Sequence, residues 1–214
     1  MRGSVVALGL VAGGIAVGAG IAANLSWRHA ATAPPPQIGG YVLPEPRSLG
    51  AFELVDETGA KFAPRDFAGR WSFLYFGYTY CPDVCPLALV ELADVKKRLA
   101  ERAPSARLSF FFVSVDPRRD TPERLHEYVA YFDPEFHGLT GEPAQIAALA
   151  SAVGAVYFVE PGQDEKTYLV SHSSNIALLE PGGGLRAVFT SPHVAGQLAD
   201  DFAAIFARYG AAAR

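Results

Sequence analysis

The chain has few cysteines, few charged residues and no excess of basic residues, and each shortage excludes a class of protein. Only two of its 214 residues are cysteines, Cys81 and Cys85, which excludes a disulfide-dense secreted scaffold and an all-cysteine zinc site. Charged residues make up 19% and apolar residues 50%, so a disordered or low-complexity chain is excluded as well. After Pro44, 16 basic residues stand against 22 acidic residues, and we expect no nucleic-acid partner.

The amino-terminal segment carries no charge over residues 5–25 and is rich in small and aliphatic residues. As a helix it would extend about 31 Å, close to the roughly 30 Å hydrocarbon core of a bilayer. This length favours a membrane anchor over a cleaved signal peptide, although Ala31-Thr32-Ala33 has the form of a cleavage site. We predict an N-terminal transmembrane helix within residues 1–28, as anchor or uncleaved signal, and a Pro/Gly-rich linker over residues 29–50.

The remaining residues, 51–210, predict one α/β domain. Two near-continuous apolar runs, residues 71–78 and 108–115, are typical of central parallel strands covered on both faces. Between them, residues 86–102 have helical spacing of leucine and valine, which completes a β-α-β unit with a right-handed crossover.

Further helices and strands are predicted in the rest of the domain. We predict helices over residues 121–132, 143–153 and 193–209, and strands over 156–160, 168–170, 176–179 and 186–189, with a short hairpin from residue 52. The glycine run at residues 182–184 joins two of these strands, so it predicts a hairpin turn rather than a phosphate-binding loop. The expected architecture is a mixed central β-sheet flanked by helices.

The two cysteines lie where the first central strand passes into its helix. The carboxyl ends of strands in an open α/β sheet collect functional groups, and a helix N-terminus favours thiolate over thiol. Cys81 and Cys85 are about one helical turn apart, so both sulfurs can point the same way across a gap that suits either a disulfide or a metal ion. A purely structural disulfide is the weakest interpretation, because it would close too small a loop to stabilise the chain much.

A third metal ligand would have to come from the five histidines. His29 lies beside the membrane segment, and His126 lies in a charged helix, so both are expected at the surface. His137 and His193 flank turns and helix starts. His172 lies among serines between two apolar stretches, where it is either a metal ligand or an ordinary loop histidine.

Four segments, in order along the chain, resemble the copper chaperones of the SCO/SenC family. They are Tyr-Phe-Gly-Tyr-Thr-Tyr-Cys-Pro-Asp-Val-Cys-Pro at residues 75–86, Ser-Val-Asp-Pro-Arg-Arg-Asp-Thr-Pro at 114–122, Gly-Leu-Thr-Gly at 138–141, and the segment around His172. The resemblance covers about residues 50–206. A four-part pattern of this kind is far more specific than an isolated cysteine pair.

The resemblance implies a thioredoxin-like fold and a metallochaperone, not an enzyme, that delivers copper to the CuA centre of cytochrome c oxidase. Cys81, Cys85 and His172 match the family's copper ligands. The implied partners are the oxidase subunit with the CuA site and possible periplasmic copper carriers or thioredoxin-like reductants, and the implied location is the periplasmic side of a bacterial inner membrane. Soft thiolates suit Cu(I), whereas zinc would need a fourth ligand.

This chain departs from the family pattern before the histidine. Many members have an acidic residue there, whereas Ser171 stands here, which leaves open what orients the imidazole. Asp116 and Asp120 end the second central strand, and either a carboxylate supporting the site or helix capping by Asp120 or Thr121 would explain them.

Two other functions use the same cysteines. A thiol-disulfide oxidoreductase would cycle Cys81 and Cys85 as a redox-active pair, acting on the cysteines of the oxidase copper site. A peroxidase would use a low-pKa thiol with Arg118 or Arg119 as the activating cation. His172 separates these possibilities, because metal binding needs it and disulfide exchange does not.

Overall fold

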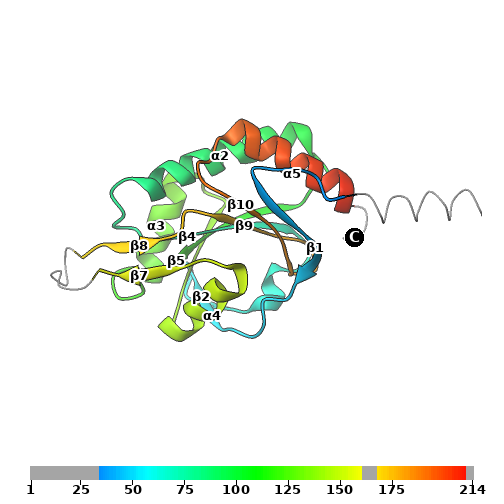
Figure 1. Ribbon diagram of the computed structural model, residues 1–214. Coiled ribbons are helices and arrows are strands. Elements are labelled where there is room, and N and C mark those ends of the chain that lie inside the picture. Colours follow the sequence, from blue (N-terminus) through cyan, green and yellow to red (C-terminus); the bar gives the residue numbers. More distant parts are fainter. Residues whose placement is uncertain (1–33, 161–167, 211–214) are drawn as a thin grey trace, which may run out of the picture. The chain divides into compact units, whose positions relative to one another are not determined.

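The structure is a computed structural model that describes residues 34–160 and 168–210 (Figure 1). The chain divides into two units, Met1–Pro35 and Pro36–Arg214, of which the second holds the folded domain. The predicted transmembrane helix and His29 lie outside the described residues. No helix in the described part of the chain has the length and apolar character that a membrane span requires.

One mixed sheet forms the centre of the domain. Its strand order is β1-β10-β9-β4-β5-β6-β2-β3, with β4, β5 and β6 parallel and every other neighbouring pair antiparallel. The strands are β1 (Gly40–Arg47), β2 (Leu54–Asp56), β3 (Lys61–Phe62), β4 (Trp71–Gly77), β5 (Leu108–Ser114), β6 (Phe136–Thr140), β9 (Ile176–Leu179) and β10 (Leu185–Phe189). The predicted α/β class with a mixed central sheet is confirmed.

Helices cover both faces of this sheet (Figure 1). They are α2 (Val84–Arg102), α3 (Pro122–Phe132), α4 (Pro143–Val153), α5 (Ala195–Tyr209) and the short 3₁₀ helix η1 (Pro64–Phe67). Phe202 of α5 packs on Phe73 of β4, and Tyr128 of α3 packs on Phe112 of β5 on the same face. Phe67 of η1 packs on Phe111, which points to the opposite face because strand side chains alternate.

The two runs predicted as central strands are β4 and β5, and they pair in parallel over their whole length. Every residue of β4 is buried, as a strand covered on both faces requires. The helix signals are also confirmed: Thr121 accepts a hydrogen bond from the Arg124 amide to cap α3, and Gly154 ends α4 with φ 77°. The sequence therefore placed the β4-α2-β5 unit, which carries both cysteines.

Two strands were not predicted. Residues 40–47, assigned to the linker, form β1, which pairs antiparallel with β10. The prolines of β1 are tolerated because it is an edge strand, and a side chain at Gly40 would collide with the Val188 carbonyl oxygen, 2.0 Å from the Cβ position. The second missed strand, β6, is short and contains His137 and Gly138, so its sequence resembles a loop.

The strands β7 (Tyr157–Val159) and β8 (Val170–His172) form a separate antiparallel pair. Among the described strands they pair only with each other. We call residues 155–160 and 168–175 the histidine arm, since they carry His172. The strand predicted at 168–170 is thus displaced to Val170–His172, and His172 ends a strand instead of lying in a loop.

The glycine run forms the predicted hairpin turn between β9 and β10. The Glu180 amide donates to the Gly184 carbonyl oxygen at 2.9 Å, and the Gly183 amide donates to the Glu180 carbonyl oxygen at 2.8 Å. Because these groups pair within the turn, the run serves to reverse the chain.

Candidate metal centre

Three side chains from three segments converge at the carboxyl end of β4. Cys81 lies in the turn after β4, where its amide donates to the Tyr78 carbonyl oxygen at 3.1 Å. Cys85 is the second residue of α2, and His172 ends β8. The two Sγ atoms and an imidazole nitrogen all lie within 4.8 Å of one another, with 3.2 Å between Cys85 Sγ and His172 Nε2.

The two thiols differ in their access to solvent. Cys81 is 8% exposed and Cys85 is fully buried, and both are free thiols. A hollow of about 480 Å³ opens beside them, lined among others by Tyr78, Cys81, Leu169 and His172. A small ion or a partner's side chain can therefore reach Cys81 and His172 from outside, while Cys85 is buried and does not line the hollow.

The imidazole of His172 is oriented by its own backbone neighbour. Its Nδ1 lies 3.2 Å from the Ser173 carbonyl oxygen, which can only accept, so Nδ1 carries the proton and donates. The lone pair is left on Nε2, the atom that faces Cys85. The Ser171 hydroxyl instead donates to the Glu160 carboxylate. A backbone carbonyl group thus orients the imidazole, with no acidic residue at position 171.

The electrostatics of the two thiols are asymmetric. A hydrogen bond from the Cys85 thiol lowers the pKa of Cys81 to about 4, against the opposing effect of burial, and backbone amides at the start of α2 assist. The same interaction raises the pKa of Cys85, and burial raises it further. Cys81 is therefore the thiolate of the reduced pair at neutral pH, and Cys85 holds the shared proton.

The remaining histidines make other contacts. His126 is exposed on α3, His137 Nδ1 lies 3.1 Å from a Glu57 carboxylate oxygen, and His193 Nε2 lies 2.6 Å from the Ser174 carbonyl oxygen. Within residues 34–160 and 168–210, Cys81, Cys85 and His172 are the one cluster of three potential ligands.

The helix cap predicted after β5 is confirmed at Thr121, which caps α3. Asp120 is fully buried with its carboxylate bonded to Thr79 and Ser114. Asp116 bonds to Arg119 and to the hydroxyl of Tyr168. Thr79 and Tyr168 were missed by the sequence reasoning, and their only signal was their position within four residues of a candidate ligand.

An α/β domain with two thiols and one imidazole at the carboxyl end of a central strand is, by its geometry, a candidate metal-binding domain. The sequence model of the SCO1/SenC family matches residues 43–207. The chain therefore belongs to the SCO1/SenC family.

Individual relatives support this assignment. A putative copper-binding protein of Stutzerimonas stutzeri is 39% identical over 159 residues, covering 73% of this chain and 76% of the relative. Protein SenC of Rhodobacter capsulatus is 42% identical over 132 residues, covering 62% of this chain and 58% of SenC, so the match spans less than two thirds of SenC's length. The crystal structure of Arabidopsis thaliana ScoI with copper bound is 33% identical with a TM-score of 0.70, covering 75% of this chain and 98% of that one.

Proposed function

We propose that this protein is a metallochaperone that binds copper through Cys81 Sγ, Cys85 Sγ and His172 Nε2 and delivers it to the CuA centre of cytochrome c oxidase. The observation that carries the proposal is the convergence of these three atoms, with 3.2 Å between Cys85 Sγ and His172 Nε2. The Stutzerimonas relative is named copper-binding and the Arabidopsis relative was crystallised with copper bound, which supports copper as the metal.

The donor set fits copper on chemical grounds. Two thiolates are soft ligands that favour Cu(I), and a neutral imidazole binds either oxidation state of copper. Metal–sulfur and metal–nitrogen bonds of about 2.3 and 2.0 Å can bridge the gap between the Cys85 and His172 donor atoms with little movement. Three ligands leave a coordination position for an incoming donor, which a transfer protein requires.

The surroundings of the site favour a protein as the recipient. Val84 and Leu169 line the hollow beside Cys81 and His172, and Leu87 lines a neighbouring hollow with Val84. All three are exposed apolar side chains. Their position suits a partner that covers the site and brings its own ligands to the metal, since apolar residues form the centres of protein interfaces.

The proposal includes the location of the domain. An anchor within residues 1–28 would hold the domain on the periplasmic side of a bacterial inner membrane, next to the oxidase. The linker would connect the anchor to the domain, and it is shorter than predicted because β1 already begins at Gly40. A reporter that is active only outside the cytoplasm, fused after residue 210, tests this: activity supports the proposed side, and a silent reporter in a stable fusion contradicts it.

The copper site is tested with His172→Ala in the full reduced chain. We expect Cu(I) affinity, measured by competition with a chromogenic chelator, to fall at least about tenfold, while the dithiol still oxidises and reduces. His126→Ala is the matched control, because His126 is exposed on α3, and it should bind copper like the wild type. Unchanged copper affinity in His172→Ala would overturn the site.

Delivery is tested separately from binding. The copper-loaded chain is mixed with the soluble CuA domain of the oxidase subunit, and the purple-copper absorption of that domain is followed in the presence of a competing chelator. Transfer that resists the chelator supports direct delivery. Transfer that the chelator abolishes would mean release into solution and would contradict the chaperone role.

A second function has a specific observation in its favour. The lowered pKa of Cys81 beside the raised pKa of Cys85 is typical of a thiol pair that attacks and then resolves disulfides. The reduced chain would then reduce the cysteines of the oxidase copper site. Reduction of an oxidised CuA domain by His172→Ala, at the wild-type rate, would favour this thiol reductase role.

A further inference from the structure

His172 lies outside the main sheet, which it joins through residues 173–175 and β9. The histidine arm pairs only within itself among the described strands, whereas Cys81 and Cys85 follow β4 at the centre of the sheet. Besides this connection, contacts outside the strand ladders hold the arm against the cysteine loop, the segment of residues 78–85 that carries both thiols.

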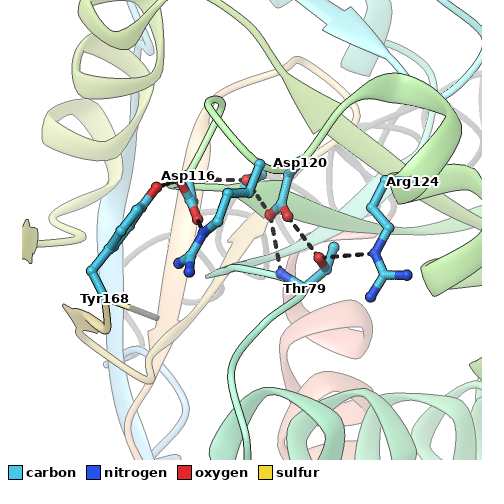
Figure 2. A network of polar contacts seen from close by, with 7 residues as sticks. Thr79, Asp116, Asp120, Arg124 and Tyr168 are labelled. Carbon is cyan, nitrogen blue, oxygen red and sulfur yellow. Dashed lines mark hydrogen bonds and ion pairs between the residues drawn. The ribbon is translucent and has the colours of Figure 1, made fainter. Parts of the chain in front are cut away.

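One such contact fixes the cysteine loop. The Asp120 carboxylate accepts hydrogen bonds from the Thr79 amide at 3.0 Å and from the Thr79 hydroxyl at 2.7 Å, and from the Ser114 hydroxyl at 2.6 Å. Arg124 Nε donates to the Thr79 hydroxyl oxygen at 3.2 Å. Figure 2 shows Thr79 between Asp120 and Arg124. Thr79 precedes Cys81 by two residues, so this buried carboxylate holds the start of the loop.

A second contact fixes the histidine arm. The Asp116 carboxylate accepts hydrogen bonds from the Tyr168 hydroxyl and from Arg119 Nε. The Arg119 guanidinium lies 3.6 Å from the centroid of the Tyr168 ring, so the ring is held at its edge and on its face. Tyr168 precedes His172 by four residues and is buried. Figure 2 shows Tyr168 reaching Asp116 from the side opposite to Thr79 and Arg124.

The two aspartates belong to a single turn. The amides of Arg119 and Asp120 both donate to the Asp116 carbonyl oxygen, at 3.1 and 3.0 Å, and the Asp116 amide donates to the Ser114 hydroxyl oxygen at 3.0 Å. The turn is thereby fixed to the end of β5. Its two carboxylates cannot move apart without breaking these bonds, so the segments that they hold are kept at one separation.

We propose that the turn of residues 116–120 is a clamp that sets the separation of the cysteine loop and the histidine arm. Asp120 positions Cys81 through Thr79, and Asp116 positions His172 through Tyr168. The clamp prepares the three-ligand site before metal arrives, which strengthens binding because less ordering is left to the binding step. The proposal rests on the copper site described above.

The arm half of the clamp is tested with Tyr168→Phe in the full chain, which removes the hydroxyl and keeps the ring under Arg119. We expect Cu(I) affinity to fall about tenfold, the scale of one hydrogen bond to a charged group. The nitrogen hyperfine coupling in the electron paramagnetic resonance spectrum of the Cu(II) form should weaken. The midpoint potential of the dithiol should stay at the wild-type value, because the arm holds the imidazole and not the sulfurs.

Tyr157→Phe is the matched control. Tyr157 lies opposite His172 in the same strand pair, and its hydroxyl makes no hydrogen bond to the residues described in the structure. This variant should keep the wild-type copper affinity and spectrum.

The loop half is tested with Thr79→Val and Thr79→Ser. Valine removes the hydroxyl that bonds to Asp120 and Arg124, and serine keeps it. We expect Thr79→Val to weaken copper binding and to shift the dithiol potential, since it loosens the segment before Cys81, and Thr79→Ser to restore both.

These outcomes separate the clamp from the copper site itself. If His172→Ala weakens copper binding while Tyr168→Phe leaves affinity and hyperfine coupling unchanged, the clamp is refuted and the copper site stands. A Tyr168→Phe protein with a lower melting temperature but wild-type copper binding also refutes it, because Tyr168 would then be only structural. If His172→Ala binds copper normally, the proposed function fails first.

Discussion

Gly77, the last residue of β4, has no room for a side chain, and this makes Gly77→Ala a sharp test of the site. A Cβ atom at this position would lie 2.7 Å from Cys85 Sγ and 2.8 Å from the Phe112 ring. Both neighbours are buried at the centre of the domain. The added methyl group must therefore displace the sulfur, the ring or the strand itself.

The size of the displacement can be worked out from these distances. Ordinary van der Waals contact begins near 3.4 Å, so a contact of 2.7 Å has to open by about 0.7 Å. Metal sites tolerate a change of only about 0.2 Å in their bond lengths. Cys85 Sγ lies 3.2 Å from His172 Nε2, so a shift of the sulfur by about 0.7 Å would disturb the spacing of these two ligand atoms. Overpacking of this kind costs about 1–3 kcal/mol in the free energy of unfolding. Copper affinity should fall by at least about tenfold in addition.

The assay combines urea denaturation with chelator competition for Cu(I) on the same preparation. Gly196→Ala is the control, because the nearest heavy atom to its Cβ position is an Arg98 guanidinium nitrogen at 3.8 Å and alanine favours the α5 helix. It should be as stable as the wild type or slightly more stable, with unchanged copper binding. Wild-type copper affinity in Gly77→Ala would refute the reasoning that packing against β4 positions Cys85.

Two further predictions concern ionisation and the histidines. In the reduced chain, alkylation of Cys81 by iodoacetamide should stay fast down to about pH 5 and slow only near its pKa of about 4, because that pKa is lowered from 9.0. In urea the same thiol should titrate near its unperturbed value, and a folded-state rate that already drops tenfold per pH unit below about pH 8 would contradict the lowered pKa. His137→Ala should lower the free energy of unfolding by about 1 kcal/mol or less, through loss of the partly exposed contact with Glu57. Its copper stoichiometry by metal analysis should equal that of the wild type, and a lower stoichiometry would contradict the assigned ligand set.

The predictable part of the fold was the part with strong local patterns. The apolar runs of β4 and β5 and the helical spacing between them located the strand-to-helix junction that carries Cys81 and Cys85. Local capping groups marked α3 and α4 for the same reason, since they act within one turn of helix. β1 was missed because its prolines and glycines resemble a linker, and only its pairing with β10 makes it a strand.

The candidate site also has a part that the sequence predicts and a part that only the structure shows. Cys81 and Cys85 are four residues apart, so their proximity follows from chain geometry alone. His172 is separated from Cys85 by 87 residues, and it was identified through the family resemblance, while its own sequence context left a loop histidine equally open. The structure added the Ser173 carbonyl that orients its imidazole, which explains how the site does without an acidic residue at position 171.

The sequence by itself determined the α/β units, the cysteine pair at the end of a central strand, and the histidine to test as the third ligand. These depend on periodicity, on spacing within one turn and on sheet geometry, all of which are local or general. Only the tertiary structure decided which side chains hold the ligands in place. Thr79 meets Asp120 across 41 residues and Tyr168 meets Asp116 across 52, and contacts over such separations are set by how the whole domain packs.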